Sequence, residues 1–186
     1  NRPRLFDLNI RKPIPLFSHA LEIDERITVD GQVLWTPDPT AIRQQLRKLQ
    51  ATGIQSLAIC LLHGDRWPAH EQLVASLAAE LGFAEISVSH QVAPLIKIVP
   101  RGDTTVVDAY LTPVLRAYIQ RIESLLASGA DASAPSSSLR LLTSAGGLVS
   151  AARFRGKDSV LSGPAGGVVG FSRAARAAGF SRAIGF

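Results

Sequence analysis

The sequence is poor in residues that form disulfides and metal sites. Its 186 residues include one cysteine, Cys60, and four histidines. A single cysteine cannot form a disulfide within the chain, and Cys60 lies in the apolar run 57–62, which is typical of a small buried core residue. None of the histidines has a second ligand at a zinc-binding spacing, so the sequence predicts no metal site.

Long apolar runs are missing as well. No segment approaches the roughly 20 apolar residues that a membrane-spanning helix needs. The first eight residues mix Arg, Asp and Asn and do not resemble a signal peptide. Hydrophobic residues make up 46% of the chain, which is ordinary for a globular protein and too many for a disordered one. We therefore expect a soluble, cytoplasmic protein with no membrane partner.

The positive charge does not indicate a nucleic-acid partner. The formal net charge is +5, from 20 Lys and Arg against 15 Asp and Glu. The basic residues are scattered along the chain, do not alternate with aromatic residues and form no nucleic-acid-binding motif. The sequence therefore predicts no nucleic-acid binding.

Helix and strand patterns alternate along the first hundred residues. Asp30 and Gly31 form a turn signal between two short β patterns, which predicts a hairpin. Asp38 can cap the helix that follows, and Gly53 and Gly82 mark helix ends. The expected elements are strands at 21–27 and 32–35, a helix from 39 to 53, a buried strand at 56–62, a helix at 68–82 and a strand at 86–89. This order indicates an α/β fold with a parallel or mixed sheet.

A long helix is expected after a strand that ends at Pro100. Gly102 would turn the chain, and Asp103 or Thr104 would cap the helix. Its apolar stripe would be Val107, Leu111, Val114, Tyr118, Ile122 and Leu125, with a kink at Pro113. Further along we expect a mobile loop at 128–138, a strand at 139–143, a turn at 145–148, a helix at 164–178 closed by Gly179, and the start of a strand at 183–186.

The glycine-rich segment 161–170, LSGPAGGVVG, carries the strongest local signal. Small residues at the start of a helix leave the backbone N–H groups open to a phosphate or another anion. They also allow close packing of the helix against a neighbour, and the pattern does not decide between the two. If the segment binds phosphate, the contacting residues are expected to be Ser162, Gly163, Ala165, Gly166 and Gly167.

Polar residues near position 103 form a second candidate site. Asp103, Thr104 and Thr105 would lie at a helix start, where they can bind a substrate, contact another domain or simply cap the helix. Asp108 fits either a ligand contact or a solvated helix residue. His63 follows the buried strand at its carboxyl end, where α/β sheets place binding residues, although it can also cap a loop. The catalytic residues themselves cannot be assigned from the sequence.

Two long motifs resemble one known family. The segment 101–115, RGDTTVVDAYLTPVL, and the segment 161–170 are similar to motifs of the hydantoinase/5-oxoprolinase enzymes, in the same order. Shorter stretches at 6–10, 62–63 and 68–71 also resemble the bacterial 5-oxoprolinase-like branch. The segment 143–147, TSAGG, departs from the Gln-Ser-Asn-Gly-Gly of many relatives, which leaves the subfamily open.

The resemblance implies an internal fragment from the N-terminal half of an ATP-dependent cyclic-amide hydrolase that converts 5-oxoproline to glutamate. It implies an incomplete actin-like, ribonuclease-H-like fold with mixed sheets and flanking helices. Residues 1–100 would end the first lobe, and residues 101–186 would begin a truncated second lobe. Such enzymes use ATP and magnesium, but the two Asp-Gly-Gly-Thr-type loops that hold them are not in this sequence. We therefore expect the chain alone to be inactive and to bind neither tightly.

Alternative functions stay open at this stage. A hydantoinase subunit or a ketone-carboxylase subunit of the same family would carry the same motifs. A non-catalytic binding or assembly module would use the glycine-rich segment only for packing. The expected partners are a small cyclic amide, the remainder of the parent enzyme and further copies in a homo-oligomer, because apolar surface would be exposed where other lobes pack.

Overall fold

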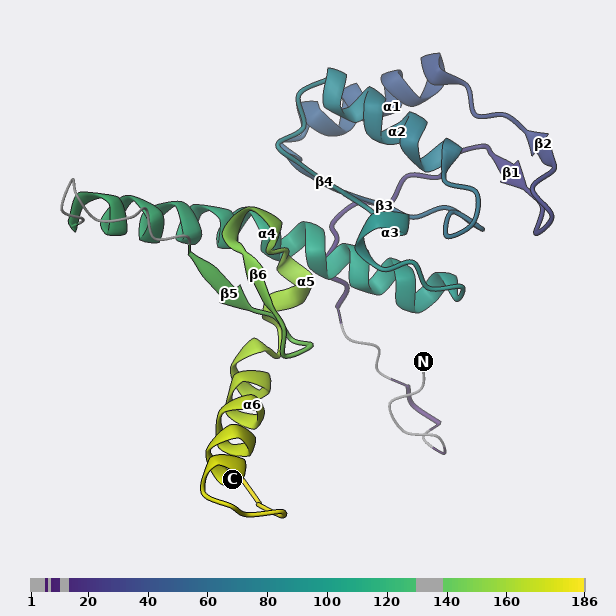
Figure 1. Cartoon of the computed structure of the whole chain (residues 1–186). Coiled ribbons are helices and arrows are strands. Elements are labelled where there is room, and N and C mark those ends of the chain that lie inside the picture. The colour runs from purple at the N-terminus through teal and green to yellow at the C-terminus, as the bar shows by residue number, and fades with distance from the viewer. Residues whose placement is uncertain (1–5, 7, 11–13, 130–138, 186) are drawn as a thin grey trace.

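A computed structural model describes residue 6 and residues 8–10, 14–129 and 139–185. The first regular element is a short antiparallel hairpin of β1 (Arg26–Ile27) and β2 (Val33–Trp35), which confirms the predicted hairpin (Figure 1). Gly31 has φ +90 in its turn, a conformation that favours glycine. The expected first strand is shorter than predicted, because residues 21–25 lie outside any strand.

An α/β unit follows the hairpin. It contains α1 (Pro39–Ala51), β3 (Ser56–Ile59), α2 (Ala69–Glu80) and β4 (Glu85–Val88). Strands β3 and β4 pair in parallel, from Ser56 opposite Glu85 to Ile59 opposite Val88. Asp38 caps α1 as predicted, because its Oδ1 accepts a hydrogen bond from the Thr40 N–H at 2.9 Å. The core consists of Ile42, Leu46, Ile59, Val74, Leu77, Ala78, Phe83 and Val88.

The strand predicted at 56–62 ends early, at Ile59. The reason is the register, because β4 ends at Val88, opposite Ile59, and offers no partner to residues 60–62. The chain turns away at His63, which has φ +60, the one positive φ of a non-glycine residue among the described residues. The predicted buried strand is therefore right in place and too long by three residues.

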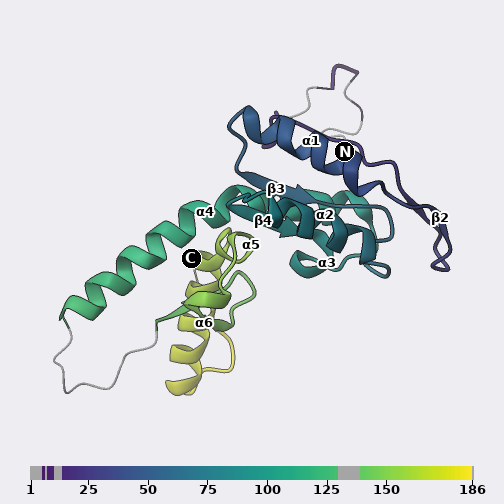
Figure 2. The ribbon, with the colours of Figure 1, turned by 90° about the horizontal axis from the view of Figure 1, so that it is seen from above.

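The long helix α4 (Ile98–Gly129) follows the short helix α3 (Ser89–Val92). Figure 1 shows α1 and α2 on one side of the strand pair and α4 on the other, and Figure 2 shows α4 passing beneath β3 and β4 and extending beyond them. The predicted strand ending at Pro100 is wrong, since α4 already begins at Ile98. Pro100 fits the first helical turn, where its missing N–H costs no hydrogen bond. The helix continues through Pro113.

The last part of the chain packs on α4 through a small hairpin. It contains β5 (Arg140–Leu142), β6 (Leu148–Ser150), the 3-10 helix η1 (Ala151–Arg153) and the one-turn helix α5 (Gly156–Ser159). The strand predicted at 139–143 is confirmed over three residues. Strand β6 was not predicted, because the glycines at 146 and 147 favour a turn and the strand that follows it is only three residues long.

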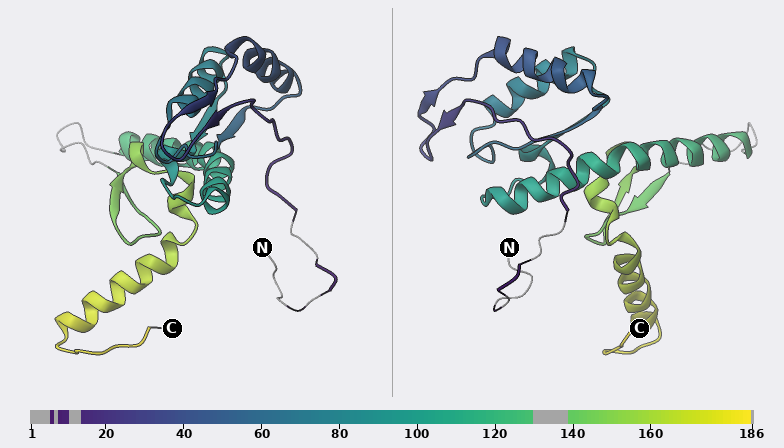
Figure 3. Two further views of the ribbon diagram at one scale, coloured as in Figure 1. Left: turned by 90° about the vertical axis from the view of Figure 1, so that its right-hand side faces the viewer. Right: turned by 180° about the vertical axis from the view of Figure 1, so that it is seen from behind.

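Helix α6 (Ser162–Ala177) extends away from the rest of the molecule (Figure 3). It begins two residues before the predicted Pro164, and Gly179, with φ +83, lies just past its end as predicted. None of its residues is buried. No strand forms at 183–185, so that prediction is wrong for these residues, whereas Phe186 and most of the loop predicted at 128–138 lie outside the described residues.

The structure confirms the α/β class and shows three two-stranded sheets, one parallel and two antiparallel, among the described residues. Within those residues, no helix combines the length and the apolar character that crossing a membrane requires. Apolar side chains are widely exposed, especially around α6, where Leu161, Val168, Phe180 and Ile184 are more than half exposed.

Candidate functional site

A buried polar stripe runs along the first half of α4. Arg101, Thr105, Asp108 and Thr112 recur at steps of three or four residues and therefore lie on one face of the helix. The first three are 0% exposed and Thr112 is 5% exposed. This face packs against β3, β4 and α5. Because buried polar groups need partners, the hydrogen bonds of these residues decide what the stripe can do.

Arg101 joins α4 to the loops at the carboxyl ends of β3 and β4. Its Nη1 lies 2.9 Å from the Asp65 Oδ1 and donates to the Leu95 carbonyl at 2.8 Å. Its Nε donates to the Ser89 Oγ at 3.0 Å, and its Nη2 donates to the Leu61 carbonyl. The guanidinium is thus engaged at all three nitrogens and acts as a fixed buried connector.

Glu71 on α2 completes this network. Its Oε1 accepts hydrogen bonds from the Leu61 N–H at 2.8 Å and from the Ser89 Oγ at 2.6 Å. Its Oε2 lies 2.7 Å from the His90 Nδ1 and 3.2 Å from the His90 backbone nitrogen. Glu71 is 0% exposed. Four contacts saturate the carboxylate, so the cluster holds the strand ends together and offers no open ligand position on Glu71.

Asp108 connects α4 to β4 and to α5. Its Oδ2 accepts a hydrogen bond from the Ser87 Oγ at 2.9 Å and lies 3.4 Å from the Arg155 Nη1. Its Oδ1 accepts from the Lys157 N–H at 3.0 Å, in the first turn of α5. One turn further on, the Thr112 Oγ1 accepts from the Gly156 N–H at 3.0 Å. Asp108 is therefore neither solvated nor open to a ligand.

The residues predicted at the start of the long helix lie inside it. Asp103 is exposed in the second turn, so it does not cap α4. The Thr104 hydroxyl donates to the Pro100 carbonyl and the buried Thr105 hydroxyl donates to the Arg101 carbonyl, both at 2.7 Å. The capping interpretation is thus wrong, because α4 begins five residues before Asp103. Of the three, Asp103 is exposed, Thr104 is half-buried and Thr105 is buried.

His63 lies in the tight turn after β3. Its carbonyl accepts hydrogen bonds from the Arg66 N–H at 3.0 Å and the Trp67 N–H at 2.9 Å. The next residue, Gly64, lies against Glu71, and a Cβ on Gly64 would be 2.4 Å from the Glu71 Oε1. The backbone of His63 therefore shapes the loop that closes over the Glu71 cluster. The structure does not bring His63 and Asp103 into contact through any hydrogen bond of the described residues.

The glycine-rich segment forms the first turns of α6. Leu161 is the N-cap residue and makes no side-chain cap, so the Ser162 and Gly163 N–H groups are the candidate donors for a bound anion. The Ala165 N–H donates to the Leu161 carbonyl at 3.0 Å and is already used. Gly166 and Gly167 lie in the body of the helix, where the N–H groups belong to the helical ladder.

The glycines of this segment differ in their surroundings. A Cβ on Gly166 would lie 2.8 Å from the Leu142 Cδ2, so Gly166 allows α6 to pack on β5. A Cβ on Gly163 or Gly167 would meet nothing within 4 Å. Packing therefore explains Gly166 and leaves Gly163, Gly167 and Gly170 without a structural reason to be glycine. Within the described ranges, no group of three or more His, Cys, Asp or Glu residues is arranged to hold a metal ion.

Family models match most of the chain. The hydantoinase/oxoprolinase model matches residues 101–186, and the model of the hydantoinase/oxoprolinase N-terminal region matches residues 1–82. The chain belongs to this family. The match to residues 101–186 contains both motifs on which the resemblance rests. The match to residues 1–82 contains α1, β3 and α2.

Several curated relatives of the chain are enzymes whose names state a substrate. The 5-oxoprolinase of Saccharomyces cerevisiae is 38% identical over 198 residues, covering 92% of this chain and 15% of the relative. The caprolactamase subunit alpha of Pseudomonas jessenii is 35% identical over 146 residues, covering 77% of this chain and 20% of the relative. The chain thus spans about 15% of the length of the first curated relatives that it matches.

Two solved structures share the fold of this family member. The crystal structure of the ATP-dependent caprolactamase from Pseudomonas jessenii has a TM-score of 0.74 and 34% sequence identity, covering 84% of this chain and 23% of that chain. The nucleotide-free structure of acetone carboxylase has a TM-score of 0.72 at 23% identity, covering 84% of this chain and 22% of that chain. At that identity the second likeness shows the fold alone. The actin-like character of the fold stays a prediction.

Proposed function

We propose that the chain works within a longer ATP-dependent hydrolase that opens the cyclic amide 5-oxoproline to glutamate. The observation that carries this proposal is 37–38% identity to 5-oxoprolinases from yeast, Dictyostelium and Arabidopsis over 92–93% of the chain. The likeness covers nearly the whole chain and therefore extends across both regions that the family models match. Caprolactam, named in the caprolactamase relative, is also a cyclic amide.

The start of α6 is the part of this chain that fits a nucleotide phosphate. The proposed contacts are the N–H groups of Ser162 and Gly163, with Gly167 giving an unobstructed approach one turn further along. Ala165 and Gly166 shape the same turn through the helical ladder and the contact with β5. When bound, ATP supplies the phosphoryl group that activates the amide carbonyl. Among the described residues, no group of three or more His, Cys, Asp or Glu is arranged around one point, and we derive no metal contact from them.

The proposed division of the chain places the end of one lobe in residues 1–100 and the start of a second in residues 101–186. Matches of two family models to residues 1–82 and 101–186 support this division. Asp103, the exposed member of the candidate set, and Thr104 beside it would contact substrate or another lobe. The rest of the enzyme, and further copies in a homo-oligomer, would cover the apolar surface around α6. We expect the isolated chain to be cytoplasmic, inactive and without tightly bound ATP or magnesium.

Phosphate release by the full-length protein tests the proposed function. The protein is mixed with ATP and magnesium, and with 5-oxoproline, hydantoin, caprolactam, a ketone with bicarbonate, or no added substrate. We expect 5-oxoproline to stimulate phosphate release above the control without added substrate. Caprolactam is the second candidate substrate, because the solved caprolactamase has a TM-score of 0.74 at 34% identity. Stimulation by hydantoin alone, or only by a ketone with bicarbonate, would refute the 5-oxoprolinase assignment.

A further inference from the structure

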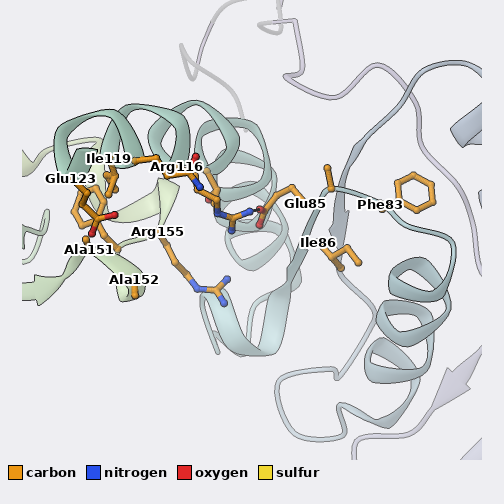
Figure 4. A pocket seen from close by; sticks show the side chains of 13 residues that line it. Phe83, Glu85, Ile86, Arg116, Ile119, Glu123, Ala151, Ala152 and Arg155 are labelled. Carbon is orange, nitrogen blue, oxygen red and sulfur yellow. Dashed lines mark ion pairs between the residues drawn. The ribbon is translucent and has the colours of Figure 1, made fainter. Parts of the chain in front are cut away.

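A cavity of about 490 Å³ lies where β4, α4 and the segment 151–155 meet. It is separate from the start of α6 and from the Glu71 cluster, whose residues do not line it. Its volume is within the range of small-molecule sites. Figure 4 shows side chains from three parts of the chain around it. The charged lining residues are Glu85, Arg116, Glu123 and Arg155.

Two arginines in this cavity are held in place by buried carboxylates. The Arg116 Nη1 lies 2.9 Å from the Glu85 Oε2, and Glu85 is 7% exposed whereas Arg116 is 55% exposed. The Arg155 Nη1 lies 3.4 Å from the buried Asp108 Oδ2, with Arg155 at 38% exposed. A guanidinium carries five N–H groups, and each of these pairs uses one terminal nitrogen. Each ion pair therefore orients a planar guanidinium group, and the remaining N–H groups of that guanidinium face the cavity or solvent.

A carboxylate lies at the other end of the cavity. Glu123 is seven residues after Arg116, so both are on the same face of α4, about 10 Å apart along the helix axis. Ile119, which is 7% exposed, lies between them. Figure 4 shows Glu123 beside Ile119 and Ala151 at one end, and the guanidinium groups of Arg116 and Arg155 toward Glu85 and Ile86. The cavity therefore has the two guanidinium groups at one end and the Glu123 carboxylate at the other.

We propose that this cavity binds an amino acid with an acidic side chain. The side-chain carboxylate of the ligand would accept hydrogen bonds from Arg116 and Arg155, and its ammonium group would pair with Glu123. A simple anion would be repelled by Glu123 and Glu85, and a simple cation by the two arginines, whereas a ligand with both charges matches both ends. The choice of L-glutamate as the probe rests on the proposed function, because glutamate is its product.

Comparing L-glutamate with glutarate tests this inference. Glutarate has the same carbon chain and two carboxylates, but no ammonium group. Calorimetric titration of the full 186-residue chain is expected to show tighter binding of glutamate. Glu123→Gln should weaken glutamate binding about tenfold, the effect of one charge-assisted hydrogen bond at an exposed site, and should tighten glutarate binding, because it removes the charge that repels the second carboxylate. Arg116→Lys and Arg155→Lys should weaken both ligands about tenfold, because lysine keeps the charge and loses the fork.

Arg121 supplies the matched control. It is exposed on α4 and does not line the cavity, so Arg121→Gln should change neither affinity. Circular dichroism of each variant confirms that it folds, and Glu123→Gln is informative even where an arginine variant unfolds, because Glu123 is exposed. Equal binding of the two ligands, or an equal effect of Glu123→Gln on both, would overturn the inference.

The two proposals fail separately. Stimulation of phosphate release by 5-oxoproline, together with binding of glutamate that does not depend on Glu123, would remove the amino-acid site and keep the enzyme assignment. Binding that depends on Glu123, without stimulated phosphate release, would keep the site and remove the 5-oxoprolinase assignment.

Discussion

Replacing Gly156 with alanine should weaken the junction between α4 and α5. The new Cβ would lie 2.7 Å from the Asp108 carbonyl oxygen, 2.8 Å from the Thr112 nitrogen and 2.9 Å from the Leu111 Cβ. Two of these atoms belong to the backbone of α4, which cannot move aside as a flexible side chain can. We therefore expect α5 to shift outward from α4 in the Gly156→Ala variant.

The cost follows from the contacts at this junction. Overpacking a tight site costs about 1–3 kcal/mol. An outward shift of α5 would also stretch the hydrogen bonds from Gly156 to Thr112 and from Lys157 to Asp108, both 3.0 Å long, and each contributes about 1 kcal/mol. We expect a loss of about 3 kcal/mol in the free energy of unfolding. With a urea m-value of about 2 kcal/mol/M, the midpoint would fall by about 1.5 M.

Urea denaturation followed by circular dichroism measures this shift. Gly170→Ala is the matched control, because Gly170 is also helical and a Cβ there would meet nothing within 4 Å. That control should raise stability by about 0.5–1 kcal/mol, since alanine favours the helix over glycine. A Gly156→Ala midpoint equal to or above that of the parent chain would refute the packing argument.

Three further predictions follow from the buried network and the candidate site. Arg101→Met should lower the free energy of unfolding by about 4 kcal/mol in the same urea assay, because it leaves Asp65, which is 7% exposed on its side chain, without its cation. Asp103→Ala should change the free energy of unfolding by less than about 0.5 kcal/mol. If Asp103 contacts substrate, the same variant should lower 5-oxoproline-stimulated phosphate release by the full-length protein about tenfold. Unchanged release would remove Asp103 from the site. Gly167→Ala should not destabilise the chain, because its Cβ meets nothing within 4 Å, but should raise the KM for ATP of the full-length protein, and an unchanged KM would contradict the phosphate role.

Local signals in the sequence predict much of the N-terminal part of the fold. Asp38 caps α1, and Gly53 and Gly82, with φ +86 and +82, lie just past the ends of α1 and α2. These features depend on neighbouring residues and on the conformational freedom of glycine, so they can be recognised without the tertiary structure. The parallel pairing of β3 and β4 likewise agrees with the predicted order of strands and helices.

The buried face of α4 could not be predicted in the same way. The apolar stripe that includes Val114 and Tyr118 was expected to face the core, but these two residues are 68% and 59% exposed. Arg101 and Asp108 occupy the buried face instead. Hydrophobic periodicity assumes that burial follows hydropathy. Here Arg101 donates hydrogen bonds to Ser89 and Asp65, and Asp108 accepts one from the start of α5. No local sequence pattern indicates these partners.

The candidate site was found only in part for the same reason. Glycine and threonine motifs are visible in the sequence, so Ser162, Gly163 and Asp103 could be selected. Glu71 was missed, because a single glutamate on a helix normally faces solvent. The arginine cavity was missed as well, since Arg116 and Arg155 are separated along the sequence and meet only when the segment 151–155 packs on α4.

Helix α4 connects the parallel strands directly to α5. At 32 residues the helix is about 48 Å long, and it passes through residues 100–103 as continuous helix. Its first half is anchored to β4 through Asp108 and to α5 through Asp108 and Thr112. Because the same Asp108 carboxylate contacts Ser87 of β4 and the Lys157 N–H of α5, we expect a rotation of α5 and its hairpin to displace β4 as well.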